Sequence, residues 1–219
     1  GVLSPLLANV LLDEVDRELE RRGHRFARYA DDCNVYVRSR WAGERVMKLL
    51  RKCYAKLRLQ VNEAKSAVAR VFGRRFLGFS FWVGPGGKVK CKVAAKPLAT
   101  FKQRVRQLTR RCVGRGMDEV VDRLRVYLLG WKGYFQLAQT PRVWRELDEW
   151  LRHRLRAIQL KQWRRGSTMY RVLLALGAPP TVARRIAANS RSWWRNSAKL
   201  LNSVLTIAHF DRLGLPRLS

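Results

Sequence analysis

The spacing of hydrophobic residues predicts a helix at the start of the sequence. Apolar residues recur every four positions, at Leu7, Leu11, Val15 and Leu19. This spacing places them on one face of an α-helix. We expect Ser4 to cap the helix, Pro5 to occupy its first position and Gly23 to end it. The acidic residues between the apolar positions predict a solvated face; they are Asp13, Glu14, Asp16, Glu18 and Glu20.

Alternating residues replace the helical spacing after residue 23. Two short segments, 24–30 and 33–37, flank Asp31 and Asp32 and predict a β-hairpin with the acidic pair at its tip. The other elements expected before residue 95 are a helix over 41–58, strands near 67–72, 75–83 and 88–93, and a turn over 84–87. This half of the chain is therefore predicted to be α+β.

Strand signals are absent after Pro97, and helical spacing takes over. Helices are predicted at about 97–112, 118–138, 141–163 and 168–176, with two shorter ones before His209. Thr140 is the expected cap of the third of these helices. We place a domain boundary near residue 95 and a weaker one near residue 165.

The charge of the chain changes the functional expectation. The 219 residues carry 46 Lys and Arg against 16 Asp and Glu, a formal net charge of +30, and 47% are hydrophobic. Such a charge repels itself unless a polyanion neutralises it, and nucleic acid is the usual polyanion. A membrane surface is the weaker alternative because the cations are not confined to one amphipathic helix. No apolar run is long enough to span a bilayer, which excludes integral membrane proteins.

Cysteine and histidine spacing argues against a zinc or disulfide framework. The four cysteines are at least twenty residues apart and form no CxxC pair; they are Cys33, Cys53, Cys91 and Cys112. The three histidines, His24, His153 and His209, have no partner at ligand spacing. A reducing intracellular environment is the expectation from this cysteine usage.

The strongest local candidate for chemistry is the segment Arg28–Asp32. Asp at a hairpin tip often only bonds nearby backbone amides, and an isolated Asp-Asp pair is usually a solvated turn. Alternatively, two carboxylates held together raise each other's pKa until a divalent cation neutralises them. Mg²⁺ suits such a pair because it takes one or two carboxylates, water and substrate phosphates as ligands.

Tyr29-Ala30-Asp31-Asp32 resembles the Tyr-x-Asp-Asp box of reverse transcriptases. Gly1–Asn9 is similar to the segment that precedes this box in the family's palm domain. Leu59–Ser66 resembles a later palm element, and Phe76–Phe79 resembles the primer-grip strand. The four motifs follow one another in the family's order and spacing.

The second half resembles the thumb, or X, region of group II intron reverse transcriptase/maturases. The similar segments are Leu129–Phe135, Trp150–Arg156, Gln162–Arg165 and Ser192–Arg195, with Phe210–Leu215 resembling the end of the maturase segment. The resemblance implies an α+β partial palm at 1–95, an all-α thumb at 96–165 and a helical maturase segment at 166–219.

This resemblance implies RNA-directed DNA synthesis by two-metal nucleotidyl transfer, together with assistance to intron splicing. Asp31 and Asp32 would hold two Mg²⁺ ions, and Lys65 would assist the leaving group, although it is also one of 46 basic residues.

The implied nucleotide pocket is Ser4, Pro5, Asn9, Tyr29 and Ala30. The implied primer grip is Phe76, Leu77, Gly78 and Phe79, in which the backbone and the space at Gly78 would serve while the apolar side chains form sheet core. The implied partners are intron RNA, an RNA template, a DNA primer and deoxynucleoside triphosphates, with no membrane, in a bacterial cytoplasm or, second, an organelle.

One departure from the family pattern limits this expectation. The family's third catalytic Asp and its fingers lie upstream of the Ser-Pro segment and have no counterpart here. We therefore expect the chain to be the carboxy-terminal portion of a longer enzyme, with its own activity left open. A non-catalytic maturase fragment and a general basic RNA-binding protein remain alternatives.

Basic and aromatic residues of the helical half are candidates for RNA contact. Flat rings beside guanidinium groups suit stacking on unpaired bases and binding of phosphate. The candidates are Arg152, Arg154, Arg156, Trp163, Arg164, Arg165, Arg191, Trp194 and Arg195. Five other aromatic residues are expected in the helical core, namely Trp131, Tyr134, Phe135, Trp144 and Trp150.

Overall fold

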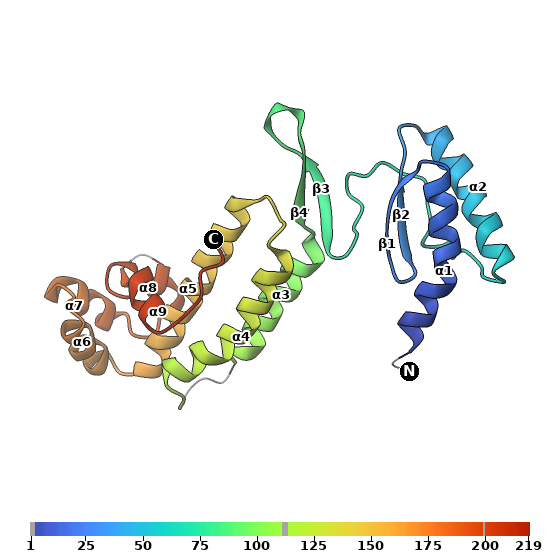
Figure 1. Ribbon diagram of the computed structural model, residues 1–219. Helices are drawn as coiled ribbons and strands as arrows, with labels where there is room; N and C mark the ends of the chain where they lie inside the picture. The colour runs from blue at the N-terminus through green and yellow to red at the C-terminus, as the bar shows by residue number, and fades with distance from the viewer. Residues whose placement is uncertain (1–2, 111–113, 199) are drawn as a thin grey trace. The chain divides into compact units, whose positions relative to one another are not determined.

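The computed structural model describes residues 3–110, 114–198 and 200–219, without the side chains of Ser4 and Pro5 (Figure 1). Cys112 lies outside this range. The chain divides into two compact units, Gly1–Phe76 and Leu77–Ser219. Helices and two small antiparallel sheets make up the fold, so the predicted α+β class is confirmed.

The first unit is a β-hairpin packed by two helices. Helix α1 (Ser4–Arg21) leads into strands β1 (Arg25–Tyr29) and β2 (Asp32–Tyr36), and α2 (Arg40–Lys56) follows. Both helices lie against the hairpin (Figure 1). The unit has a small core of Leu12, Val15 and Leu19, on which Phe26, Val35 and Leu49 pack. The predicted helix, hairpin and second helix are confirmed.

Two details of α1 differ from the prediction. The helix begins at Ser4, which places Leu3 in the capping position and Pro5 second in the helix, so the predictions of a Ser4 cap and of a first-position Pro5 are wrong. The apolar face is also buried only from Leu12 onwards, while Leu7 is 64% exposed. Gly23 ends the helix as expected, with a φ of 69° that suits glycine.

The strand predicted near 67–72 is wrong. Apart from a single bridge residue at Phe72, this segment is irregular. Val68 lies so close to α2 that a Cβ on Gly43 would come within 2.5 Å of its side chain. Val68 therefore packs on a helix, and no neighbouring strand within the described residues supplies a hydrogen-bond ladder to this segment.

The second unit begins with a hairpin of β3 (Phe79–Val83) and β4 (Val89–Val93), joined by the 3₁₀ turn η1 (Pro85–Gly87). The strand predicted from residue 75 starts later because Leu77 and Gly78 both have positive φ, 50° and 78°. This hairpin belongs to the helical unit: Gln139 donates its backbone N–H to the carbonyl of Cys91 at 2.8 Å. The compact units thus separate before the hairpin, whereas the three predicted domains stay a prediction.

The remaining chain is helical. The helices are α3 (Ala95–Leu108), α4 (Met117–Phe135), α5 (Pro141–Trp163), α6 (Gly166–Ala175), α7 (Pro180–Ala188), α8 (Trp193–Ala198), the 3₁₀ helix η2 (Leu201–Ser203) and α9 (Ile207–Arg212). Three short α-helices therefore follow α6 where two were predicted. Thr140 occupies the predicted N-cap position of α5, but its hydroxyl is buried and makes no cap hydrogen bond. No helix in the described ranges is long and apolar enough to cross a membrane.

The core of the second unit is built on α4 and α5. Trp131 packs with its ring centroid 4.5 Å from that of Phe101 and 5.3 Å from that of Trp144. Burial of Trp131, Phe135 and Trp144 confirms their predicted core positions, and Trp150 packs on the core while partly exposed. Tyr134 is 56% exposed, so its predicted core position is wrong.

Candidate functional site

The Asp31–Asp32 pair lies at the tip of the first hairpin. Tyr29 pairs with Asp32, which leaves Ala30 and Asp31 as a two-residue turn. Both carboxylates are exposed. Ala30 has a φ of 51°, a left-handed conformation that costs a residue with a Cβ about 1–2 kcal/mol. The predicted hairpin tip is therefore correct, and its backbone is strained beside Asp31.

Arg28 connects this turn to α1. Its Nε lies 2.9 Å from both carboxylate oxygens of Asp16, and its Nη2 lies 2.5 Å from Oδ2. Its Nη1 donates to Oδ1 of Asn9 at 2.9 Å and to the carbonyl of Ala30 at 3.1 Å. The side chains of Arg28 and Asp16 are only 11% and 19% exposed. The Asp16 carboxylate raises the pKa of Arg28 above its usual value, so the guanidinium stays charged.

The sequence did not predict this arrangement. Asp16 was expected on a solvated face, and the structure places it half-buried against β1. Asn9, predicted in a nucleotide pocket, accepts a hydrogen bond from Arg28 through its side chain, and its predicted role stays a prediction. The available signal was Arg28 itself, a cation next to the acidic turn.

Lys65 is exposed in a turn beyond α2. Its backbone N–H donates to the carbonyl of Asn62 at 3.1 Å and to Oδ1 of Asn62 at 3.2 Å. In the described part of the chain, no hydrogen bond or ion pair joins the Lys65 side chain to Asp31 or Asp32. The role predicted for Lys65 therefore stays a prediction, as do those of Ser4, Pro5 and Tyr29.

The Asp31–Asp32 pair supplies the kind of ligand that a divalent metal takes, but too few such ligands to complete a site. Carboxylate oxygens are the hard ligands that Mg²⁺ takes, with substrate phosphates and water completing the shell. Within residues 3–110, 114–198 and 200–219, no three His, Cys, Asp or Glu side chains gather into a metal-binding group. Asp31 and Asp32 would supply part of the ligand set, and the third carboxylate expected from the family has no counterpart in those ranges.

The Phe76–Phe79 segment is occupied by contacts within the protein. The Tyr134 hydroxyl donates to the carbonyl of Leu77 at 3.1 Å, and the backbone N–H of Ala94 donates to the carbonyl of Gly78 at 2.9 Å. A Cβ on Gly78 would lie 3.2 Å from the ring of Phe135. The space at Gly78 is thus filled by protein, which corrects the expectation that a primer backbone approaches there. Phe79 packs on Phe135, with ring centroids 5.2 Å apart, consistent with a sheet-core role.

Two of the predicted RNA contacts are buried inside the second unit. Arg152 is 4% exposed and pairs with Asp148 at 3.1 Å. Arg156 is 5% exposed and donates from Nε to the carbonyl of Leu205 at 2.8 Å. Burial lowers the pKa of Arg156 to about 10. The prediction that these two arginines contact RNA is therefore wrong, because their guanidinium groups are used inside the fold.

Arg154 and Trp163 also make contacts within the second unit. Arg154 donates from Nε to the Thr109 hydroxyl at 2.7 Å, which joins α5 to the end of α3. Trp163 is half-buried and packs on the core. The other five candidates are exposed: Arg164, Arg165, Arg191, Trp194 and Arg195.

Aromatic and basic side chains gather where α5 meets α8. We call this the α5–α8 surface and define it as His153, Lys161, Trp193, Trp194 and Arg195. Trp194 is 51% exposed, and its ring centroid lies 3.8 Å from that of His153. Nε2 of His153 lies 2.9 Å from the carbonyl of Trp194, and Lys161 lies 5.3 Å from the ring of Trp193. This surface offers flat rings and cations to a ligand.

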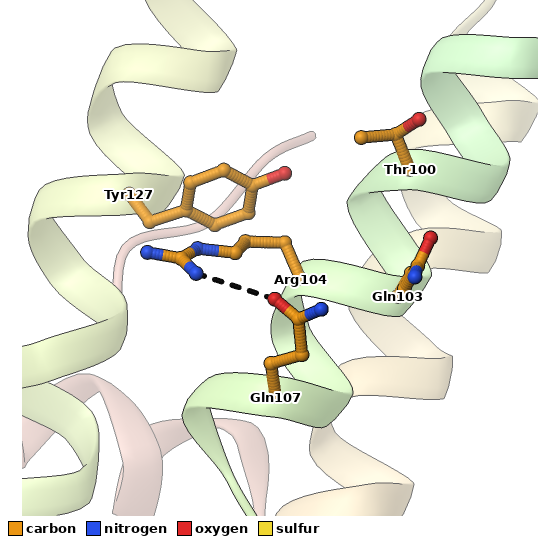
Figure 2. Close-up of a pocket in the computed structure, with 5 residues that line it drawn as sticks. All are labelled: Thr100, Gln103, Arg104, Gln107 and Tyr127. Carbon is orange, nitrogen blue, oxygen red and sulfur yellow. Dashed lines mark hydrogen bonds between the residues drawn. The ribbon is translucent and has the colours of Figure 1, made fainter.

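A surface pocket of about 320 Å³ lies between α3 and α4. Figure 2 shows its lining residues, Thr100, Gln103, Arg104, Gln107 and Tyr127. Nη1 of Arg104 donates to Oε1 of Gln107 at 3.2 Å along the α3 side of the pocket. The lining includes one cation and no acid, so the pocket is unsuited to the metal chemistry considered for Asp31 and Asp32.

Two family models match the chain. Residues 1–81 match the reverse transcriptase (RNA-dependent DNA polymerase) model, and this range contains the Asp31–Asp32 turn. Residues 98–177 match the model of the group II intron maturase-specific domain, which spans α4 and α5. No curated protein matches the chain.

Proposed function

Because the chain belongs to the group II intron reverse transcriptase/maturase family, we propose that its Asp31–Asp32 turn serves RNA-directed DNA synthesis. The supporting observation is the exposed carboxylate pair at the tip of a two-residue turn, inside the range that matches the reverse transcriptase model. Arg28 also donates a hydrogen bond to the Ala30 carbonyl in this turn, at 3.1 Å.

The reaction joins a primer 3′-hydroxyl to the α-phosphate of a deoxynucleoside triphosphate and releases pyrophosphate. Reverse transcriptases use divalent metal ions, which when bound activate the hydroxyl and stabilise the leaving group. In this chain Asp31 and Asp32 would hold such ions through their carboxylate oxygens. Lys65, exposed and cationic, would neutralise charge that develops on the leaving pyrophosphate.

Primer extension on an RNA template with Mg²⁺ tests the catalytic proposal. The wild type is compared with Asp31→Asn and with a matched control, Asp13→Asn, which removes an exposed carboxylate paired only with Arg17. We expect synthesis to disappear in Asp31→Asn and to persist in the control. Synthesis that survives in Asp31→Asn would contradict the proposal.

We further propose that the second unit binds intron RNA. From Trp150 to Phe210 the sequence contains twelve Lys and Arg residues and no Asp or Glu. Several of these cations are exposed, and Trp194 is 51% exposed on the α5–α8 surface, next to Arg195 in the sequence. Stacking of a base on an aromatic ring contributes about 1–3 kcal/mol, so Trp194→Ala should weaken RNA binding roughly 5- to 150-fold.

The matched control for this surface is Arg142→Ala. Arg142 lies at the opposite end of α5, is exposed and pairs with Glu146 at 2.8 Å. We expect Arg195→Ala to weaken RNA binding while Arg142→Ala leaves it near the wild-type value. Equal losses in both variants would show that binding follows total charge and not this surface.

A non-catalytic maturase is the second candidate function. The observation in its favour is the lack of a third metal-binding carboxylate beside Asp31 and Asp32 within the described residues. On this alternative, wild-type chain makes no DNA, and Asp31→Asn leaves both RNA affinity and assistance to splicing unchanged. Loss of splicing assistance in a folded Asp31→Asn protein would exclude it.

A further inference from the structure

We propose that Arg28 is a positioning residue that holds the Ala30–Asp31 turn in the conformation needed by the Asp31 carboxylate. The proposal rests on the proposed catalytic function of this turn. Its physical basis is the contact from Nη1 of Arg28 to the carbonyl of Ala30 at 3.1 Å. That carbonyl belongs to the peptide group that leads into Asp31, so its orientation determines where the Asp31 backbone and side chain lie.

The turn needs such support because its backbone is strained. Ala30 keeps a φ of 51° although it has a Cβ. A strained conformation of this kind persists only where surrounding contacts over-determine it. Among the described residues, Arg28 is the side chain that donates to the Ala30 carbonyl.

Arginine is suited to this role because it presents five donors in a rigid plane. Asp16 binds one edge of the guanidinium with both of its oxygens and thereby fixes the plane. Asn9 and Ala30 accept from the remaining nitrogen, Nη1. A lysine at this position has a single flexible ammonium group and could not satisfy all three acceptors with the same geometry.

Pairing with Asp16 also balances the charge of Arg28. An unpaired cation beside the turn would compete with a divalent metal for Asp31 and Asp32. The Asp16 carboxylate at 2.5 Å neutralises most of that effect locally. Among the described residues, Asp16 and Asn9 from α1 and the Ala30 carbonyl from the turn accept hydrogen bonds from the Arg28 guanidinium. Cys33 and Tyr54 also act on it electrostatically.

The test compares Arg28→Lys, Arg28→Gln and Asn9→Ala with the control Arg40→Gln in the full 219-residue chain. Arg40 also forms an arginine–carboxylate pair, with Glu44 at 3.0 Å, but on the exposed face of α2. Amide hydrogen exchange at Asp31 and Asp32 is measured without metal, together with the melting temperature. We expect exchange at the turn to become at least tenfold faster in Arg28→Gln and intermediate in Arg28→Lys, with no change in Arg40→Gln.

Asn9→Ala keeps the proposal testable if Arg28→Gln does not fold, since it leaves the pair of Arg28 and Asp16 intact. It should speed exchange at the turn by less than Arg28→Gln does. Folded Arg28→Lys and Asn9→Ala proteins with wild-type exchange at Asp31 would overturn the proposal. So would a lower melting temperature without a local change at the turn, because that pattern describes a merely structural arginine.

A second readout separates this inference from the proposed function. Mn²⁺ broadening of the Asp31 and Asp32 amide signals reports metal at the turn, and Asp31→Asn should reduce it. In Arg28→Gln we expect a roughly tenfold higher Mn²⁺ concentration for equal broadening. If Asp31→Asn broadens like the wild type, the metal-binding function fails, and the hydrogen exchange data still decide whether Arg28 holds the turn.

Discussion

Arginines in this chain fall into two groups: those buried in contacts within the fold and those exposed to solvent. Arg28, Arg152 and Arg156 are largely buried and bind carboxylates or carbonyls. Arg164 and Arg195 are exposed. The net charge of +30 therefore overstates the charge that any one ligand meets. Which arginines contribute to binding is decided by burial and partner, and single substitutions can separate the two groups.

Replacing Arg152 with alanine should destabilise the second unit strongly. The change leaves the buried Asp148 carboxylate without its cation, and removing one partner of a buried pair costs about 3–5 kcal/mol. Urea unfolding measures the loss. The control is Arg195→Ala, an exposed site where the stability should change by less than about 0.5 kcal/mol. An Arg152→Ala protein as stable as wild type would show that Asp148 is adequately held by the backbone amides of Leu218 and Ser219.

Glu18 gives a pH-dependent prediction. Hydrogen bonds from Arg21 and then Arg22 lower the pKa of Glu18 to about 2 from an ordinary value of 4.5. Because the folded-state pKa is depressed, the stabilisation is complete above about pH 4.5 and is lost as the pH falls toward 2. The melting temperatures of wild type and Glu18→Gln should therefore differ above pH 4.5 and converge near pH 2. A difference that is constant over this range would contradict the assignment.

For single residues, the sequence predicted the local element in which a residue lies better than it predicted the residues that it contacts. The acidic turn followed from alternation around Asp31 and Asp32, which is a local property. The partners of Arg28 lie twelve and nineteen residues away, so no local pattern could identify them. Burial of Arg152 and Arg156 was not predicted for a similar reason. Arg152, Arg154 and Arg156 are spaced by two and so lie on more than one face of α5, and only tertiary packing decides which face is covered.

Helices and strands with strong periodicity were predicted well, and failures arose where neighbours decided the outcome. The α1 helix and the β1–β2 hairpin follow from spacing and from Gly23. Segment 67–72 has a strand-like composition, but it is irregular and its Val68 packs on α2 at Gly43. A strand requires a partner as well as a pattern, and the sequence of one segment contains no information about that partner.

Close packing of α6 on α7 can be tested at Gly166. A Cβ there would lie 2.7 Å from the backbone carbonyl oxygen of Ala187, which cannot move without shifting α7. We expect Gly166→Ala to destabilise the second unit by about 1–3 kcal/mol in urea unfolding. Gly130→Ala in α4 is the matched control, since nothing lies within 4 Å of its Cβ position. Alanine there should stabilise the helix by about 0.5–1 kcal/mol, and destabilisation at both sites would argue against a specific contact at α6.

The whole molecule combines a small unit that carries an acidic turn with a larger unit that carries most of the charge. Residues 1–76 contribute +8 and residues 77–219 contribute +22 to the net charge. The cores are separate as well: Leu12, Val15 and Leu19 form one, and the helices from α3 onwards form the other. The proposed metal site and the proposed RNA-binding surface thus belong to different units, so substitutions can remove each without the other.

RNA binding should depend steeply on salt if phosphates are the main contacts. Contact with about 6–10 phosphates lowers affinity about 10³- to 10⁵-fold between 50 and 200 mM salt. Titration of RNA at several salt concentrations measures the slope of log affinity against log salt. Arg195→Ala should reduce that slope by about one, because it removes one cation. Trp194→Ala removes stacking without charge and should lower affinity at every salt concentration with the slope unchanged.

These two slopes distinguish a maturase-type interface from general adhesion of a basic protein. If +30 of net charge alone drove binding, Trp194→Ala would have no effect and an unrelated structured RNA would compete as well as group II intron RNA. If exposed rings at the α5–α8 surface read unpaired bases, the tryptophan variant loses affinity and unrelated duplex RNA competes poorly. Asp31→Asn should leave both slopes unchanged, because its carboxylate lies in the first unit. A change of slope in that variant would mean that the acidic turn is itself part of the RNA-binding surface.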